Sequence, residues 1–363
     1  MDFEYDFHSN HDLSLNKNFF KTKGLSGIIN TMNKCYSNSI IQCLSHTLKF
    51  TDFMLSNKLQ NEIIESNLKS KKEYPVLNSF KLLLIKLWNT NELIIPNMFY
   101  KNLYEHLQKY NNVQQQDSHE FLLDILELLH KALSYKIDVT ISGEVLNETD
   151  NLTKNSLIYW KKTYENEYSQ IVELFNGMSV NLIECKNCHY ESNSIFESFN
   201  TINLNILNTP SCSLSNCLDN FFTQSNIDDW KCDKCNNIGC TESLNLWSLP
   251  NYLIIQLKRF DNNGIKINNL IDFPIDDLDL TQYILPKKND PNNYIYNLYA
   301  INYHSGNINN GHYWTSIRNL DNNWYILNDG HISKYSNNSD MKMNLVTSDA
   351  YLLFYYRKMI TKK

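Results

Sequence analysis

Apolar residues recur at helical spacing in the N-terminal half of the chain. Ile40 and Ile41 lie four and three positions before Leu44. The same spacing returns at residues 121–129, which read FLLDILELL. One face of an α-helix repeats about every 3.6 residues. The pattern therefore predicts a helical subdomain from residue 35 to about residue 135.

The hydrophobic period changes after the polar stretch 136–165, which we expect to include a loop. The runs SVNLIEC and FNTINLNI then alternate, as is typical of strands bounded by turns. YLIIQLKRF predicts a central strand, and later runs predict an antiparallel meander: YNLYAINYHS, HYWTSIRN, NNWYILND and DAYLLFYYRK. The expected fold class is α+β, preceded by an N-terminal extension at residues 1–23, where periodicity is weak.

Length and composition limit the classes of protein to which this chain could belong. The 363-residue chain is long enough for a large core, and its formal net charge of -6, without a basic block, disfavours nucleic-acid binding. It has no apolar run of about eighteen residues, so no membrane span is expected. The start, MDFEYDFHSNHDL, does not resemble a secretion signal, which favours an intracellular protein of the cytoplasm or nucleus. The nine cysteines are then expected to be reduced, as metal ligands, a nucleophile and buried thiols.

Four cysteines form two CxxC pairs, Cys185 with Cys188 and Cys232 with Cys235. Two such turns at hairpin tips bring four thiolates together in the tetrahedral arrangement that zinc prefers in structural sites. We expect one structural Zn²⁺, with no position open for a reactive water. Strands must fill the gap between the pairs, and residues 214–222 are expected to supply one of them.

Other interpretations of these cysteines remain open. CKNCH matches a haem-attachment pattern, although the missing export signal and the second pair disfavour haem. A redox CxxC or thiols without metal are further alternatives. His189 and Cys240 lie near enough in the sequence to replace a ligand, and Cys43, Cys212 and Cys217 are taken as ordinary thiols.

Cys35 stands where the polar run of NTMNKCYSNSIIQCL gives way to an apolar repeat. This places its thiol in the first turn of the predicted helix. Free backbone N–H groups and the positive end of the helix dipole stabilise a thiolate there. A cysteine that only packs the helix is the alternative.

A histidine and two polar residues near the C-terminus complete a candidate catalytic set. His312 begins one predicted strand, and Asn328 and Asp329 end the next, after a turn at 321–323. Cysteine, histidine and then asparagine or aspartate is a known order for acyl transfer. The sequence leaves open which of Asn328 and Asp329 orients the ring, and a core role for His312 is the alternative. For His304 a core role is favoured.

Five ordered segments resemble the signature boxes of the ubiquitin-specific proteases. They are GIINTMNKCYSNSIIQCL, QQDSHEFLLDILELL, the two CxxC pairs, LPNYLIIQLKRF and HSGNINNGHYWTSI with WYILND. The resemblance implies a papain-like cysteine protease domain over residues 24–358. Its thumb would span about 24–165, its fingers, which carry the zinc ribbon, about 166–250, and its palm about 251–358.

The resemblance also implies catalytic roles. Cys35 matches the nucleophile, His312 the general base and Asn30 the amide that donates to the oxyanion. Asn328 matches the usual third triad position, and Asp329 matches an adjacent acid on which some members depend. Such an enzyme is a cysteine-type ubiquitinyl hydrolase, which cleaves the bond after the C-terminal glycine of ubiquitin.

Substrate contacts follow from the same resemblance. Asp117 and Glu120 match carboxylates that receive the basic tail of ubiquitin, and Phe260 and Tyr313 match aromatic residues that line the tail channel. The zinc ribbon matches the fingertips, which grip the globular part of ubiquitin. The segment DSHE, which contains both carboxylates, also fits a helix-capping pair, so capping is the alternative role for Asp117.

Two residues depart from the family pattern just before Cys35. Met32 and Lys34 stand where the family usually has glycine and threonine. If the glycine has a positive φ, Met32 is expected to crowd the loop that presents Asn30. Lys34 either favours the thiolate or is solvated.

The expected function is that of a deubiquitinating thiol protease, with ubiquitin and ubiquitinated proteins as partners. A catalytically impaired ubiquitin-binding scaffold and a protease for a ubiquitin-like modifier are the alternatives. A zinc-ribbon module that binds nucleic acid is more distant, because the chain is acidic.

Overall fold

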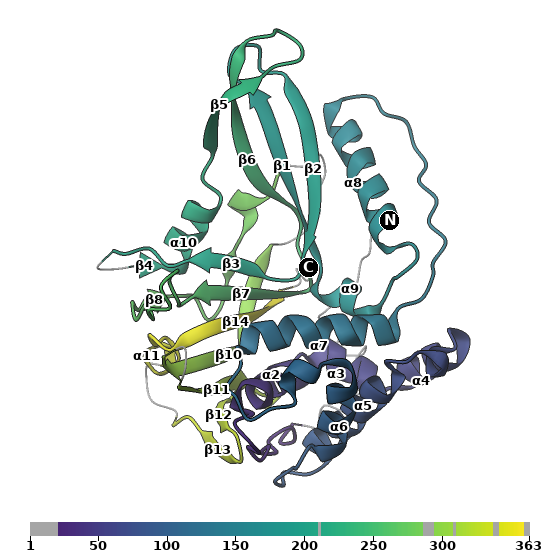
Figure 1. Ribbon diagram of the computed structural model, residues 1–363, viewed down its shortest axis with the longest axis vertical. Helices are drawn as coiled ribbons and strands as arrows, with labels where there is room; N and C mark the ends of the chain where they lie inside the picture. The colour runs from purple at the N-terminus through teal and green to yellow at the C-terminus, as the bar shows by residue number, and fades with distance from the viewer. Residues whose placement is uncertain (1–20, 210–211, 286–293, 308–309, 337–340, 359–363) are drawn as a thin grey trace, which may run out of the picture.

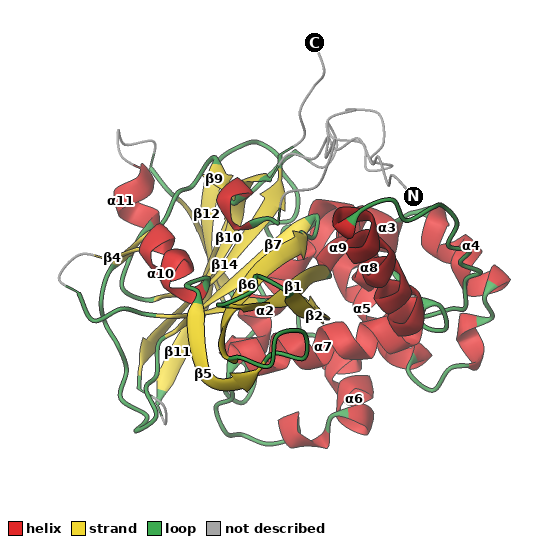
Figure 2. Cartoon of the chain, turned by 90° about the horizontal axis from the view of Figure 1, so that it is seen from above, coloured by secondary structure: helices red, strands yellow, loops and turns green. Residues whose placement is uncertain are grey.

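A central sheet separates a helical lobe from a tall β-ribbon in the computed structural model of this chain (Figure 1). Seen from above, most helices gather on one side, while α10 and α11 lie on the other side with the strands (Figure 2). Most of the predicted N-terminal extension lies outside the described residues, which are 21–209, 212–285, 294–307, 310–336 and 341–358. Within these ranges no helix is both long and apolar enough to cross a bilayer.

The helical lobe confirms the helical periodicity of residues 35–135. Its first helix is buried along its whole length, because it packs against α3, α7 and the strands β10 to β12 of the central sheet. The helices of the chain are α2 (Cys35–Ser45), α3 (Leu48–Leu55), α4 (Asn57–Glu65), α5 (Tyr74–Asn89), α6 (Asn97–His106), α7 (Ser118–Leu133), α8 (Glu148–Tyr164), α9 (Gln170–Phe175), α10 (Leu214–Phe221) and α11 (Met341–Leu345), with short 3₁₀ turns η1 (Leu68–Ser70), η2 (Gln108–Tyr110) and η3 (Thr281–Tyr283).

The strands form two main sheets. The ribbon has the order β2-β1-β6-β5, and the central sheet has the order β13-β12-β11-β10-β14-β7-β3, with β9 beside β10. The strands are β1 (Gly177–Cys185), β2 (Glu191–Phe199), β3 (Ile202–Asn205), β4 (Cys212–Ser213), β5 (Ser225–Lys231), β6 (Ile238–Ser248), β7 (Tyr252–Lys258), β8 (Ile271–Asp272), β9 (Leu278–Asp279), β10 (Ile295–Gly306), β11 (Gly311–Arg318), β12 (Trp324–Asn328), β13 (His331–Lys334) and β14 (Ala350–Arg357).

The predicted meander is correct for β10 to β13, whereas β14 returns to the other side of β10. The central sheet is buried on both faces because successive side chains of a strand point to opposite sides. On β14, Leu352 and Phe354 face the helical lobe, while Leu353 and Tyr355 face a second core that includes α10. This explains why the strand is a continuous apolar run rather than an alternating one.

Two sequence predictions of local structure need correction. The stretch 136–165 contains a loop but also the long helix α8, whose Leu152, Tyr159 and Trp160 pack on the ribbon. Residues 214–222 form helix α10 rather than a strand. Ser213 and Asn216 make a capping box there, and this local helix-start signal is stronger than the short apolar alternation.

A buried polar bridge joins the helical lobe to the central sheet. Asn302 on β10 accepts a hydrogen bond from Ser118 Oγ at 2.8 Å and donates to Ser39 Oγ at 2.8 Å. All three side chains are buried. Because Ser39 lies one helical turn after Cys35, the bridge fixes the nucleophile helix and the start of α7 against the same strand.

Replacing Asn302 should destabilise the fold. In Asn302→Ala the hydroxyl of Ser118 loses its buried partner, and we expect the free energy of unfolding to fall by roughly 1–3 kcal/mol. Asn226→Ala, on the exposed part of β5, is the matched control and should change it by less than about 0.5 kcal/mol. Denaturant unfolding followed by fluorescence measures both. If the two variants had the same free energy of unfolding, the polar bridge would not stabilise the fold as expected.

Candidate functional site

Cys35 is the first residue of α2, as the sequence predicts, and its side chain is buried. The preceding loop turns through two residues with positive φ, Met32 at 60° and Asn33 at 61°. Lys34 N donates to Asn30 Oδ1 at 2.7 Å, which holds the loop closed. The side chain of Met32 is 67% exposed, so the expected crowding of this loop does not occur.

His312 lies on β11, beside Cys35 and Asn328. Its Nε2–H donates to Asn328 Oδ1 at 2.6 Å from the neighbouring strand β12. The pKa of His312 is raised to about 9, mainly by a hydrogen bond with Cys35; burial opposes this shift and Asn328 supports it. The ring also stacks on Trp314 at 6.1 Å. The thiol of Cys35, from the first helix, and the amide of Asn328, from the next strand, thus both act on the imidazole of His312.

Asp329 makes different contacts from its neighbour Asn328. Its φ of 50° turns the backbone at the end of β12. Its carboxylate accepts from Asn30 Nδ2 at 3.0 Å and from Asn38 Nδ2 at 2.8 Å. The structure thus places Asn328 on the histidine and Asp329 on the predicted oxyanion amide. Sequence reasoning missed Asn38, although it lies one helical turn after Cys35 and so shares its face of α2.

The two predicted substrate carboxylates lie at the start of α7. Asp117 is the N-cap and accepts from the backbone N–H of His119 at 2.6 Å and of Glu120 at 3.3 Å. Its other oxygen accepts from Tyr351 OH at 2.7 Å. Glu120 does not close a capping box; its exposed carboxylate pairs with Lys109 at 2.5 Å. Capping is therefore one role of Asp117, and the carboxylate of Glu120 faces solvent.

Aromatic rings surround His304 on β10. His304 and Tyr313 have centroids 4.5 Å apart, and Phe260 lies edge-on to the same imidazole at 5.6 Å. Burial, together with the cation of Lys266, lowers the pKa of His304 to about 4, so the ring is neutral at physiological pH. The favoured core role of His304 agrees with this packing, which also joins the two predicted channel aromatics into one cluster.

The four CxxC cysteines meet at the tip of the ribbon, where β1 and β5 end. Their Sγ atoms all lie within 4.8 Å of one another, with Cys185–Cys235 at 3.6 Å and Cys188–Cys232 at 3.7 Å. A tetrahedral ion with metal–sulfur bonds of about 2.3 Å needs sulfur separations of about 3.8 Å. The cluster fits a metal ion. The two substitute ligands considered from the sequence are not in this set, and His189 pairs with Glu184 instead.

Lys34 is neither solvated nor paired with an acid. Only 2% of its surface is exposed, and its Nζ donates to the backbone carbonyls of Tyr110 and Asn112. The expectation that Lys34 is solvated was therefore wrong, and the alternative, that it favours the thiolate, stays a prediction. The sequence carries no signal for the contact, because its acceptors are backbone groups far along the chain.

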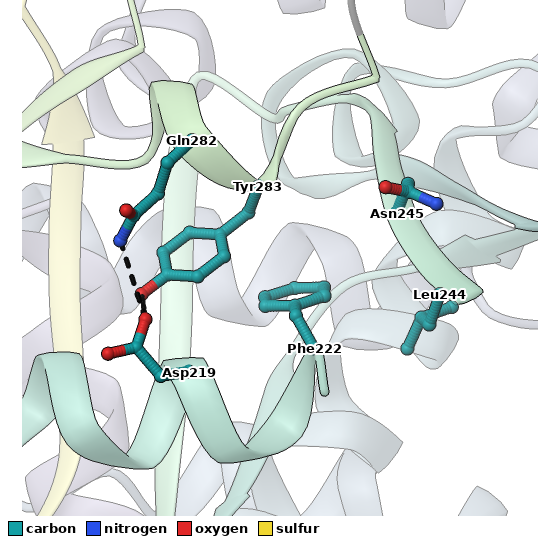
Figure 3. A pocket seen from close by; sticks show the side chains of 6 residues that line it. All are labelled: Asp219, Phe222, Leu244, Asn245, Gln282 and Tyr283. Carbon is teal, nitrogen blue, oxygen red and sulfur yellow. Dashed lines mark hydrogen bonds between the residues drawn. The ribbon is translucent and has the colours of Figure 1, made fainter. Parts of the chain in front are cut away.

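A hollow beside the ribbon has no part in this site. It is lined by residues of α10, β6 and η3 (Figure 3). Phe222 stacks on Tyr283 at 4.8 Å, and Tyr283 OH donates to Asp219 at 2.6 Å. These contacts join the end of α10 to η3, and none of the predicted catalytic residues lies among those that line the hollow.

Comparison with known proteins places this geometry in a family. The model of the family described as ubiquitin carboxyl-terminal hydrolase matches residues 26–355. Ubiquitin carboxyl-terminal hydrolase Usp2 of Drosophila melanogaster is 32% identical over 346 residues, covering 93% of this chain and 35% of the relative. Ubiquitin carboxyl-terminal hydrolase 2 of Homo sapiens is 29% identical, covering 92% of this chain and 55% of the relative. The chain thus spans about a third to just over half of these two relatives.

A solved structure shares the fold. The SAGA Ubp8/Sgf11/Sus1/Sgf73 DUB module bound to ubiquitin aldehyde contains a chain that matches 94% of this protein, over 71% of its own length, with 25% identity and a TM-score of 0.73. This likeness confirms the predicted α+β fold of a ubiquitin-specific protease. With a family match that spans nearly the whole sequence, the chain belongs to the ubiquitin carboxyl-terminal hydrolase family.

Proposed function

We propose that this protein is a deubiquitinating thiol protease that hydrolyses the isopeptide or peptide bond after the C-terminal glycine of ubiquitin. The observation that carries the proposal is that the imidazole of His312 is hydrogen-bonded to Asn328 and has its pKa raised mainly by Cys35. This set supplies a nucleophile, a base and an orienting group for acyl transfer. The complete set favours an active enzyme over a ubiquitin-binding scaffold.

The reaction follows from the contacts of His312. The imidazole takes the proton of Cys35, and the thiolate attacks the carbonyl carbon of the scissile bond. Asn328 holds the ring so that its other nitrogen faces the sulfur. When the tetrahedral intermediate collapses, the imidazolium gives its proton to the leaving amine and a thioester remains. His312 then takes a proton from water, whose oxygen attacks the thioester, and ubiquitin leaves with a free carboxylate as Cys35 regains its proton.

Asn30 is suited to stabilise the oxyanion. A primary amide has two N–H donors and a carbonyl acceptor. In this structure Oδ1 accepts from Lys34 N, and Nδ2 donates to Asp329, which leaves the second N–H for the oxyanion. We assign Asp329 the role of orienting Asn30, and Asn328 the role of orienting His312. An oxyanion donor of this type contributes about 3–4 kcal/mol in another protease.

The surroundings of the site suit the tail of ubiquitin. Asp117 and Glu120 offer negative charge at the start of α7, and the ring cluster of Phe260 and Tyr313 offers an apolar wall. The similar DUB module is bound to ubiquitin aldehyde, which supports ubiquitin and ubiquitinated proteins as partners of this chain. We place the enzyme in the cytoplasm or nucleus, where such conjugates occur.

We assign the four-cysteine cluster to one structural Zn²⁺. Four thiolates without a carboxylate or an open position suit zinc in a structural role. Cys185, Cys188, Cys232 and Cys235 would hold the ion and join the tips of β1 and β5. The metal would stabilise the end of the ribbon, which we expect to contact the globular part of ubiquitin.

A ubiquitin probe with a C-terminal electrophile tests the proposed activity. The wild-type protein should form a covalent adduct, seen as a shift on a denaturing gel, and Cys35→Ala should form none because the nucleophile is gone. Cys43→Ala, which removes a buried thiol of the same helix, should still be labelled. A wild-type protein that binds ubiquitin without labelling would instead favour the scaffold.

The pH dependence of kcat/KM should reveal the imidazolium. Activity is expected to fall as the pH rises through about 9, since the raised pKa of His312 keeps its proton available for the leaving amine below that value. Asn328→Ala removes a contact that raises this pKa, so the alkaline limb should move to lower pH. The carboxylate of Asp329 also raises this pKa, but less than Asn328 does, so Asp329→Ala should move the limb less and should mainly lower kcat, because it frees Asn30. If both variants moved the alkaline limb of the kcat/KM profile by the same large amount, Asn328 and Asp329 would not have the separate roles assigned to them.

Metal analysis of the purified protein tests the ribbon. We expect about one zinc ion per chain, lost in Cys188→Ser and Cys235→Ser because a closed thiolate site needs all four ligands. Cys240→Ser, outside the cluster, should keep its zinc. If the unmutated protein, purified without chelators, contains no zinc, the assignment is wrong.

A further inference from the structure

Lys34 is a buried cation directly before the candidate nucleophile. Its Nζ donates to Tyr110 O at 2.6 Å and to Asn112 O at 2.7 Å. The rings of Tyr36 and Tyr104 lie 5.7 and 5.5 Å from the same nitrogen. Among the residues that the structure describes, no carboxylate lies within ion-pair distance of it. Burial lowers the pKa of Lys34, so its charge depends on the two carbonyls and the rings.

The two carbonyls belong to one segment, formed by the last residue of η2 and the loop that leads from η2 to α7. A second contact joins the same segment to the nucleophile loop, because Asn33 Nδ2 donates to Val113 O at 2.9 Å. Two consecutive residues before Cys35 therefore hold residues 110–113 from one side. Burial of Tyr110, whose ring lies edge-on to Phe121 and whose hydroxyl donates to Asp124, anchors the segment on α7. The contacts with Lys34 and Asn33 tie it to the nucleophile loop.

The far end of the segment contacts the strand that carries the base. Gln115 Oε1 accepts from Gly311 N at 2.5 Å, and Gln115 Nε2 donates to Gly311 O at 2.6 Å. Gly311 directly precedes His312. A side chain cannot be added there, since its Cβ would lie 2.1 Å from His304 Nε2. The side-chain amide of Gln115 thus pairs with the backbone of β11 at the residue next to the imidazole.

We propose that Lys34 is a positioning residue that aligns His312 with Cys35 through residues 110–115. Its ammonium fixes the start of this segment to the nucleophile loop, and Gln115 fixes the end to Gly311. The segment is the brace between two catalytic groups that come from different elements. The proposal adds to the proposed function a residue that touches neither substrate nor the reacting atoms.

Two variants of Lys34 and a matched control test this role. Lys34→Met keeps the apolar stem and removes the donors, whereas Lys34→Arg keeps donors for both carbonyls. Lys71→Met is the control, because Lys71 Nζ also binds backbone carbonyls, those of Lys131 and Ser134, at the opposite end of α7 from Asp117. Both methionine variants should lower the melting temperature, which separates a loss of stability from a loss of alignment.

The expected results differ between the sites. Lys34→Met should lower kcat for a ubiquitin substrate by roughly tenfold to a hundredfold, since small misplacements of catalytic groups have effects of this size, with a smaller change in KM. At neutral pH, iodoacetamide should alkylate Cys35 more slowly in Lys34→Met than in the wild-type protein. Mass spectrometry identifies the alkylated residue. Lys34→Arg should retain much of the wild-type kcat and alkylation rate. Lys71→Met should leave both quantities unchanged.

Contrary outcomes are equally clear. A folded Lys34→Met protein with wild-type kcat and alkylation rate would overturn the proposal, as would a Lys71→Met protein with the same losses. If Lys34→Met does not fold, Asn33→Gly decides, because it keeps the positive φ, removes the contact with Val113 and should show smaller losses of the same kind. Alkylation needs no ubiquitin, so it tests the brace even if the wild-type protein fails to cleave ubiquitin.

Discussion

The candidate site depends on one constraint: the thiol of Cys35 and the imidazole of His312, from opposite ends of the chain, must lie beside each other. Neither residue can be placed without a large amount of packing. Helix α2 is buried along its whole length, and its Cys43 Sγ lies 3.0 Å from Thr315 Oγ1 on β11. Thr47 Oγ1, just past the end of α2, lies 2.7 Å from Tyr299 OH on β10. The core therefore sets the distance between nucleophile and base, and the polar residues around them set their orientation.

Two adjacent residues at the end of β12 have separate tasks because the backbone changes direction between them. Asn328 is still in the strand and faces the neighbouring strand, where it meets His312. Asp329 has a left-handed φ and faces the loop before α2, where it accepts from Asn30 and Asn38. The change of backbone direction therefore gives two residues that look equivalent in the sequence different contacts.

Sequence patterns were informative where the structure is local or the chemistry is fixed by spacing. Helical periodicity located the first lobe, and two CxxC turns predicted the four-cysteine cluster. Helix α8 was missed because its few packing residues are spread through a polar stretch, and α10 because its capping box was read as part of a strand. The surroundings of Lys34 could not be predicted, since they depend on backbone carbonyls that a sequence does not reveal.

The departures at Met32 and Lys34 have opposite energetic effects on the same loop. A left-handed residue other than glycine costs roughly 1–2 kcal/mol, and Met32 with a φ of 60° carries such a cost next to the oxyanion amide. Contacts that hold the loop offset it, namely those of Asn30 with the backbone of Lys34 and of Lys34 Nζ with two carbonyls. A strained conformation persists only where its surroundings determine it. The side chain of Lys34 therefore helps to hold the loop in which Met32 has its left-handed conformation.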